Sequence, residues 1–124
     1  TVEHIFPRSG KVSDWSEVVA SSDELEQITA EYLHCLGNLT LSGYNSRLSN
    51  QSFPKKQAKS EASIFGMPIN IGYRNGLALN NIPFTVGGKP VTLAAADRWT
   101  IEHIKARNSV MVDMLIELFK LDGE

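Results

Sequence analysis

The clearest pattern along the chain is a run of apolar residues spaced three and four apart near its start. This spacing predicts a helix over about residues 22–36, with one buried stripe formed by Leu25, Ile28, Tyr32 and Leu36. Ser21, with Glu24 three residues later, has the spacing of a capping box at the helix start. Gly37 could end the helix as a left-handed cap.

Short segments on either side of this helix have the character of β-strands. Residues 1–7 are rich in β-branched and aromatic side chains and stop at a proline, which favours an extended backbone. Residues 38–41 alternate and predict a second strand. Successive side chains on a strand point to opposite faces, so we expect Glu3 and His4 to face opposite ways.

The rest of the chain predicts more helix, interrupted by a glycine-rich and proline-rich stretch. Helices are expected over 44–50 and over 53–62, because Pro54 suits a first helical turn. Residues 66–92 read as a long excursion with a hairpin turn at its two adjacent glycines, 87 and 88. A final helix over about 94–121 is expected to pack on the core through Ile101, Ile104, Met111, Leu115 and Leu118.

Composition indicates one soluble globular domain, or part of one. The chain has 124 residues, of which 42% are hydrophobic and 21% charged, enough to form one core. The net charge of -2 is a mild argument against a free-standing nucleic-acid binder, which is usually basic. One cysteine rules out an internal disulfide and suits a reducing cytoplasm, and no apolar run is long enough to span a membrane. A chain that opens without methionine is expected to be the C-terminal part of a longer protein.

Three short motifs carry the candidate chemistry. They are VEHIFP, which contains Glu3 and His4, GNLTL, which contains Asn38, and NSRLSN, which begins at Asn45. An acid–histidine strand, an asparagine that opens a second strand and an asparagine early in the next helix resemble the ββα-metal pattern of HNH nucleases. Over residues 1–60 the chain is similar to the C-terminal nuclease domain of GmrSD-type, modification-dependent restriction enzymes, a branch also found in phosphorothioation-linked phage-defence nucleases.

This resemblance implies an α+β fold. The expected architecture is a ββα-metal (HNH) core with an inserted helix between the strands and a C-terminal helical extension. A single HNH-type nuclease domain would span residues 1–124, with the core in 1–60, the excursion in 66–92 and the packing helix over about 94–121.

The resemblance also assigns roles to individual residues. A histidine titrates near neutral pH, so His4 can act as the general base that takes a proton from water. Glu3 and Asn45 offer the oxygen ligands that suit Mg²⁺, or Mn²⁺ or another divalent cation. By analogy, Asn38 helps to hold the loop or the imidazole in place. Asn50 is a further candidate for a metal or phosphate contact, although a helix-end or turn role is favoured.

Positive charge gathers directly after the proposed metal helix. The expected contacts with the DNA backbone are Arg47, Lys55, Lys56 and Lys59, with Arg107 as a weaker candidate. A run of charges is also typical of an ordinary solvated surface, so this role depends on the adjacent site.

A second group of residues suggests zinc but lacks the required spacing. His34 and Cys35 are neighbours, and His4 and His103 could join them, yet no Cys-x-x-Cys or His-x-x-x-His pair is present. We therefore expect His34 to pack or hydrogen-bond near the second strand and Cys35 to be a small core residue. The pair Glu102-His103 repeats the earlier dipeptide in a helical context and is expected to be a solvated or packing pair.

These features predict a metal-dependent HNH endonuclease that nicks or cleaves DNA in a restriction or phage-defence system. The expected partners are DNA and an upstream domain that supplies recognition, with oligomerisation possible through the parent protein and no membrane involved. Two alternatives stay open. One is a degenerate HNH fold kept as a DNA-binding or assembly module, and the other is an RNA-cleaving HNH nuclease.

Overall fold

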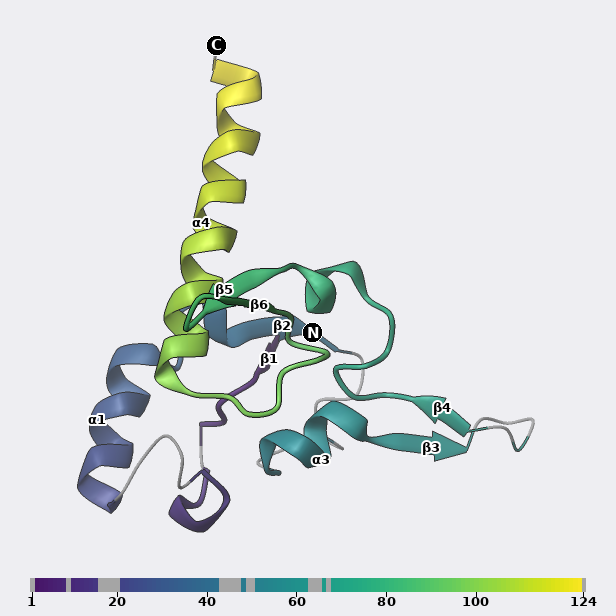
Figure 1. The fold of residues 1–124 in the computed structure, drawn as a ribbon. Helices are drawn as coiled ribbons and strands as arrows, with labels where there is room; N and C mark the ends of the chain where they lie inside the picture. Colours follow the sequence, from purple (N-terminus) through teal and green to yellow (C-terminus); the bar gives the residue numbers. More distant parts are fainter. Residues whose placement is uncertain are drawn as a thin grey trace.

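The structure, a computed structural model, has short strands and helices in a mixed α+β arrangement (Figure 1). It describes residues 2–8, 10–15, 21–42, 48, 51–62, 66 and 68–123. The α-helices among these residues are α1 (Ser22–Tyr32), α3 (Phe53–Ala58) and α4 (Ile101–Gly123). The strands are β1 (Val2–His4), β2 (Leu39–Leu41), β3 (Ser60–Ala62), β4 (Pro68–Asn70), β5 (Phe84–Val86) and β6 (Lys89–Val91). Short 3-10 helices are η1 (Val12–Asp14), η2 (Leu36–Asn38) and η3 (Ala78–Asn81).

The two predicted strands are present and pair with each other. β1 and β2 are antiparallel, with Glu3 opposite Thr40 and His4 opposite Leu39. β1 is shorter than the expected residues 1–7, because the chain bends directly after His4 into a segment that Asn38 holds by hydrogen bonds. This bend puts His4 at the very end of its strand.

Helix α1 is inserted between these two strands, and the prediction of its start is confirmed. The Ser21 hydroxyl accepts a hydrogen bond from the Glu24 N–H at 3.2 Å, as an N-cap should. The helix ends at Tyr32, earlier than expected, and the chain turns into η2. The expected left-handed cap at Gly37 is wrong, because Gly37 lies inside η2 and does not have a positive φ.

Close contact with helix α4 explains the glycine at position 37 instead. A Cβ added there would lie 2.2 Å from the Ile104 carbonyl oxygen and 2.5 Å from the Asn108 backbone nitrogen. The Asn108 side chain, the one polar interruption in the apolar stripe of α4, accepts the Gly37 N–H at 2.9 Å. Position 37 is therefore the point where η2 and α4 touch backbone to backbone.

We expect Gly37→Ala to destabilise the protein by about 3 kcal/mol, since the added methyl group meets backbone atoms that have no freedom to rotate away. Chemical denaturation would measure the change in the free energy of unfolding. Ser109→Ala, on an exposed position of the same helix, is the matched control and should change it by less than about 0.5 kcal/mol. Equal stabilities of the two variants would show that the contact is looser than described.

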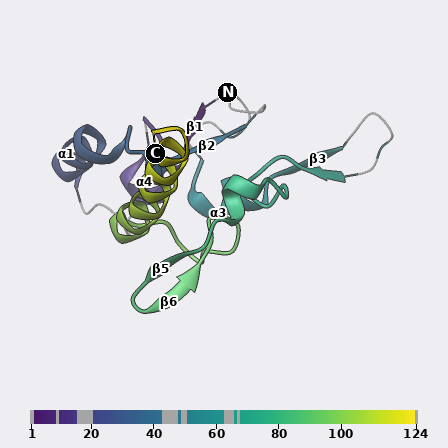
Figure 2. The same cartoon turned by 90° about the horizontal axis from the view of Figure 1, so that it is seen from above.

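The middle of the chain differs most from expectation. Helix α3 begins as predicted but ends at Ala58, because residues 60–62 pair with residues 68–70 as strands β3 and β4. The hairpin expected at the two glycines is confirmed: Gly87 and Gly88 connect β5 to β6, with φ values of 59° and 78°. The helix expected over 44–50 lies outside the described residues, except for the buried Leu48. Figure 2 shows the β3–β4 and β5–β6 hairpins extending from the body in different directions.

Helix α4 is shorter at its start and less buried at its end than expected. It begins at Ile101 rather than 94, after a turn in which the Ala96 N–H bonds to the Thr92 carbonyl. Its first half packs on the core, but the helix then projects from the body (Figure 1). Leu115 and Leu118 are 43% and 60% exposed, so the predicted packing of the whole stripe is wrong for this distal half.

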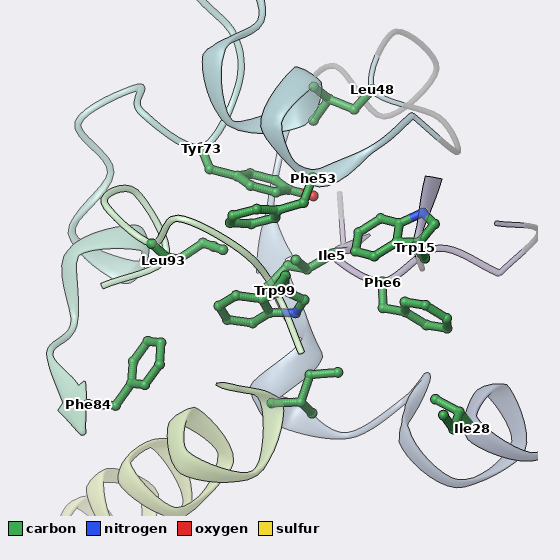
Figure 3. Packing of buried hydrophobic residues seen from close by; sticks show 12 residues of the cluster. Ile5, Phe6, Trp15, Ile28, Leu48, Phe53, Tyr73, Phe84, Leu93 and Trp99 are labelled. Carbon is green, nitrogen blue, oxygen red and sulfur yellow. The ribbon is translucent and has the colours of Figure 1, made fainter. Parts of the chain in front are cut away.

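The core brings together the segment after β1 with α1, α3, β5 and the start of α4, largely around aromatic side chains (Figure 3). Trp99 lies at its centre, stacked on Phe53 with ring centroids 5.5 Å apart and edge-on to Phe84. Ile5 and Phe6, directly after His4, are fully buried in the same cluster, and Phe6 packs edge-on against Trp15. The residues that follow His4 are thus anchored in the core, which fixes the end of β1.

Candidate active site

His4 stands at the end of β1, partly buried and partly open to solvent. Its Nε2 atom lies 3.1 Å from Nδ1 of His34, and the two rings meet edge-on at 70°. Burial lowers the pKa of His4 below its ordinary value of 6.5, and the nearby charges of His34, Arg8 and Lys56 lower it further. The imidazole is therefore predominantly neutral at pH 7, which is the form that can accept a proton.

Asn38 holds the chain immediately after His4. The Asn38 side chain is fully buried, and its Oδ1 atom accepts the Phe6 N–H at 2.8 Å and the Trp99 indole N–H at 3.3 Å. Its Nδ2 atom donates to the carbonyls of Phe6 and Leu33, both at 3.0 Å. Of the two tasks expected for Asn38, these contacts correspond to holding the loop, because they all reach the loop and its surroundings rather than the imidazole.

Glu3 faces the opposite side of the strand, as the alternation predicted. It is only 5% exposed, and its Oε2 atom accepts a hydrogen bond from the Tyr73 hydroxyl at 2.5 Å and lies 3.2 Å from the Lys56 ammonium. Burial, followed by the Glu3 carboxylate, raises the pKa of Tyr73 well above its usual value. Tyr73 is therefore protonated at every physiological pH and remains a donor to Glu3.

The predicted role of Lys56 is wrong. The sequence predicted a contact with the DNA backbone, but its side chain is fully buried. Its ammonium bonds to Glu3 and also to the backbone carbonyls of His4 and Ile5, at 2.9 and 3.2 Å. Burial lowers the pKa of Lys56, whereas the Glu3 carboxylate opposes this shift. Lys56 is an internal cation that fixes the strand carrying Glu3 and His4.

Arg107 is a second cation that the structure places inside the protein rather than at its surface. It is fully buried, and its guanidinium donates to the carbonyls of Gly37, Leu39 and Leu79 at 2.9, 2.7 and 3.3 Å. Burial lowers its pKa to about 10, so it stays charged at pH 7. Its weaker candidacy as a DNA contact is therefore wrong, and it joins α4 to β2 instead.

The remaining predicted site residues divide into two groups. Lys55 is exposed and Lys59 is partly exposed, so both ammonium groups are accessible at or near helix α3. Asn45, Arg47 and Asn50 lie outside the described residues. Whether Asn45 approaches Glu3 therefore stays a prediction.

The donor chemistry at Glu3 is compatible with a hard divalent cation. A carboxylate has about four lone-pair directions, so Glu3 keeps acceptor capacity beside its bonds to Lys56 and Tyr73. With an amide oxygen from Asn45, it would supply the sparse oxygen ligands that Mg²⁺ accepts. Within the described residues, no group of three or more histidine, cysteine or acidic side chains could hold a metal ion.

Two residues near His4 and Glu3 were not predicted to belong to the site. Tyr73 lies in the excursion, 70 residues from Glu3 in sequence, and no local pattern relates the two. His34 was expected to pack or hydrogen-bond near the second strand, and it contacts His4 at the end of the first. The pair Glu102-His103 was expected to be either solvated or packed. His103 packs in the core against Trp99 and Phe84.

Comparison with known proteins identifies the family. Residues 1–114 match the family model described as GmrSD restriction endonucleases, C-terminal domain. No curated protein and no solved structure gives a significant match. Among the described residues, no helix is long and apolar enough to cross a membrane. Because the match spans most of the chain, the chain belongs to the family of GmrSD restriction endonuclease C-terminal domains.

Proposed function

We propose that this chain is a metal-dependent endonuclease domain of the HNH type that hydrolyses DNA phosphodiester bonds. Membership of the GmrSD family implies a nuclease role in restriction. The observation that carries the finer proposal is the position of His4, a neutral imidazole at the end of an antiparallel strand pair, with the next two residues locked in the core. In this proposal the two strands would form the ββ part of a ββα-metal core, and the helix expected over 44–50 would complete it.

His4 is the general base in this proposal. It takes a proton from the attacking water. Its position is held by Asn38, which bonds to Phe6 two residues on, and by Lys56, which donates to the carbonyl of His4. Glu3 and Asn45 would hold the cation. When bound, a divalent cation supplies charge neutralisation at the phosphate and stabilises the departing oxygen.

Contact with the DNA backbone is assigned to the accessible cations. Lys55 and Lys59 are on the surface, and Arg47 keeps its predicted role as a backbone contact. Asn50 stays a candidate for a further metal or phosphate contact, although a helix-end or turn role is favoured. Lys56 is removed from this set because its ammonium is buried. Recognition of a modification or sequence, and any oligomerisation, would reside in an upstream part of the parent protein, acting in the cytoplasm.

Removal of divalent cations tests this function directly. The full-length protein that carries this domain should convert supercoiled plasmid to nicked or linear DNA with Mg²⁺ or Mn²⁺, and should lose this activity in EDTA. Gel electrophoresis of the plasmid would follow both products. Excess cation added after EDTA should restore cleavage, which controls for damage to the protein.

The same assay separates the alternatives. Preferential cleavage of RNA in a parallel digestion would favour the RNA-directed HNH nuclease. Metal-independent binding of DNA without any turnover would favour a degenerate binding or assembly module. Cleavage that proceeds equally well in EDTA would contradict the metal-dependent mechanism.

A further inference from the structure

A second histidine contacts the proposed base. His34 lies two residues after the end of α1, and its Nδ1 atom is 3.1 Å from Nε2 of His4. The ring centroids are 5.1 Å apart and the rings meet edge-on. This distance and geometry correspond to an N–H···N hydrogen bond between side chains that are 30 residues apart in sequence.

Both histidines are carried by backbone that is held in place. The carbonyl of Leu33, directly before His34, accepts the Nδ2 amide of Asn38, and the Cys35 N–H bonds to the Tyr32 carbonyl. On the other side, β2 pairing and the Lys56 ammonium hold the backbone of His4. Helix α1 thus ends close to β1, and the turn that follows it places the His34 side chain against His4.

The chemistry of imidazole gives this contact a consequence. A neutral imidazole has one N–H donor and one lone-pair acceptor, on different nitrogens. A hydrogen bond at Nε2 of His4 selects which nitrogen carries the proton and fixes the direction of the ring. If Nε2 donates to His34, the lone pair of His4 is on Nδ1, the nitrogen on the other side of the contact.

We infer that His34 is a positioning residue for the reaction, which holds the His4 ring so that Nδ1 is the nitrogen that accepts the proton from water. This inference rests on the proposed function, in which His4 is the general base. His34 itself does not touch the reacting atoms. Without it, the His4 ring is free to rotate about its side-chain bonds and to exchange tautomers, and only part of the population is ready to react.

Two substitutions at one position separate the hydrogen bond from the mere presence of a side chain. The amide of asparagine can occupy the place of the imidazole Nδ1 atom, whereas leucine has similar size and no polar atom. We expect His34→Leu to lower kcat for plasmid cleavage on the order of ten- to a hundredfold, with KM for DNA within about twofold of the original. His34→Asn should recover most of this loss. Since His34 is exposed, neither substitution should change Tm appreciably.

Nuclear magnetic resonance supplies a readout that a purely structural role would not move. Nitrogen-15 shifts of His4, recorded near pH 8, should report a single Nε2–H tautomer in the original protein and in His34→Asn. In His34→Leu they should report a mixture of tautomers. Wild-type turnover with an unchanged tautomer in His34→Leu would overturn the inference, as would equal impairment of the leucine and asparagine variants.

Failure of this inference can be told from failure of the proposed function. If His4→Ala retains full activity, the function assigned to His4 fails. If His4→Ala is inactive while His34→Leu turns over normally, only the inference about His34 fails. A rise in KM at unchanged kcat in His34→Leu would instead identify an exposed contact with DNA and would also overturn it.

Discussion

His4→Ala is expected to lower kcat for metal-dependent DNA cleavage by roughly 10²- to 10⁴-fold, which is the usual contribution of a positioned general base. KM for DNA should change little, because the accessible lysines rather than His4 are assigned to the backbone. Steady-state cleavage of plasmid by the full-length protein would measure both constants. Added imidazole should restore part of the activity by entering the space that the side chain left.

The pH dependence of cleavage provides an independent check on the same residue. Burial and the charges of His34, Arg8 and Lys56 lower the pKa of His4 below 6.5. A base acts in its neutral form, so the acid limb of the kcat profile should lie below pH 6.5, with activity falling as the pH drops through the pKa of the folded protein. Arg8→Ala removes one of the positive neighbours and should move this limb toward higher pH.

Two results would contradict the assignment of His4. One is full divalent-dependent cleavage by His4→Ala. The other is an acid limb that keeps its position in His4→Ala at reduced rate, since the titrating group would then lie elsewhere. Because His4 is only partly buried, its replacement should leave the fold intact, and circular dichroism would verify this.

Local signals were sufficient for the elements whose geometry is set by nearby residues. The Ser21 cap, the β5–β6 turn at Gly87 and Gly88, and the extended backbone of the strand that carries His4 follow from short-range backbone preferences. The end of α3 did not follow, because residues 60–62 favour helix locally but find a partner strand several residues later. The packing predicted for the distal half of α4 failed for a similar reason. A periodic apolar stripe predicts a buried face, but it does not show which part of the protein would cover that face.

The same distinction between local and distant signals holds for the candidate site. The motifs predicted His4, Asn38 and Glu3 as candidate site residues, and the structure places all three on or next to one strand pair. The environments of Glu3 and His4 are set by residues remote from them in sequence, Tyr73 and His34 respectively, which no spacing rule connects to them. The predicted DNA contact of Lys56 is wrong for the same reason. Two adjacent lysines cannot be told apart from the sequence, and only the fold shows that Lys56 is buried while Lys55 is exposed.

The pair of Glu3 and Lys56 carries the largest expected effect on stability. Lys56→Met removes the ammonium but leaves the Glu3 carboxylate buried, with Tyr73 as its remaining donor in the described part of the chain. Breaking a buried ion pair in this way costs about 3–5 kcal/mol, because a charge stays inside without its partner. Urea denaturation should show this loss in the free energy of unfolding, together with weaker anchoring of the His4 and Ile5 carbonyls.

Two further variants decide whether the cost comes from the charge or from packing. Lys55→Met changes the exposed neighbour in the same helix and should alter the free energy of unfolding by less than about 0.5 kcal/mol. In the double variant Glu3→Gln/Lys56→Met the buried charge is absent, so much of the stability should return. If the double variant is as unstable as Lys56→Met alone, packing of the lysine side chain and its bonds to the backbone outweigh the ion pair. If Lys56→Met is no less stable than Lys55→Met, the ammonium is not the internal cation of the strand, and position 56 returns to the set of DNA contacts.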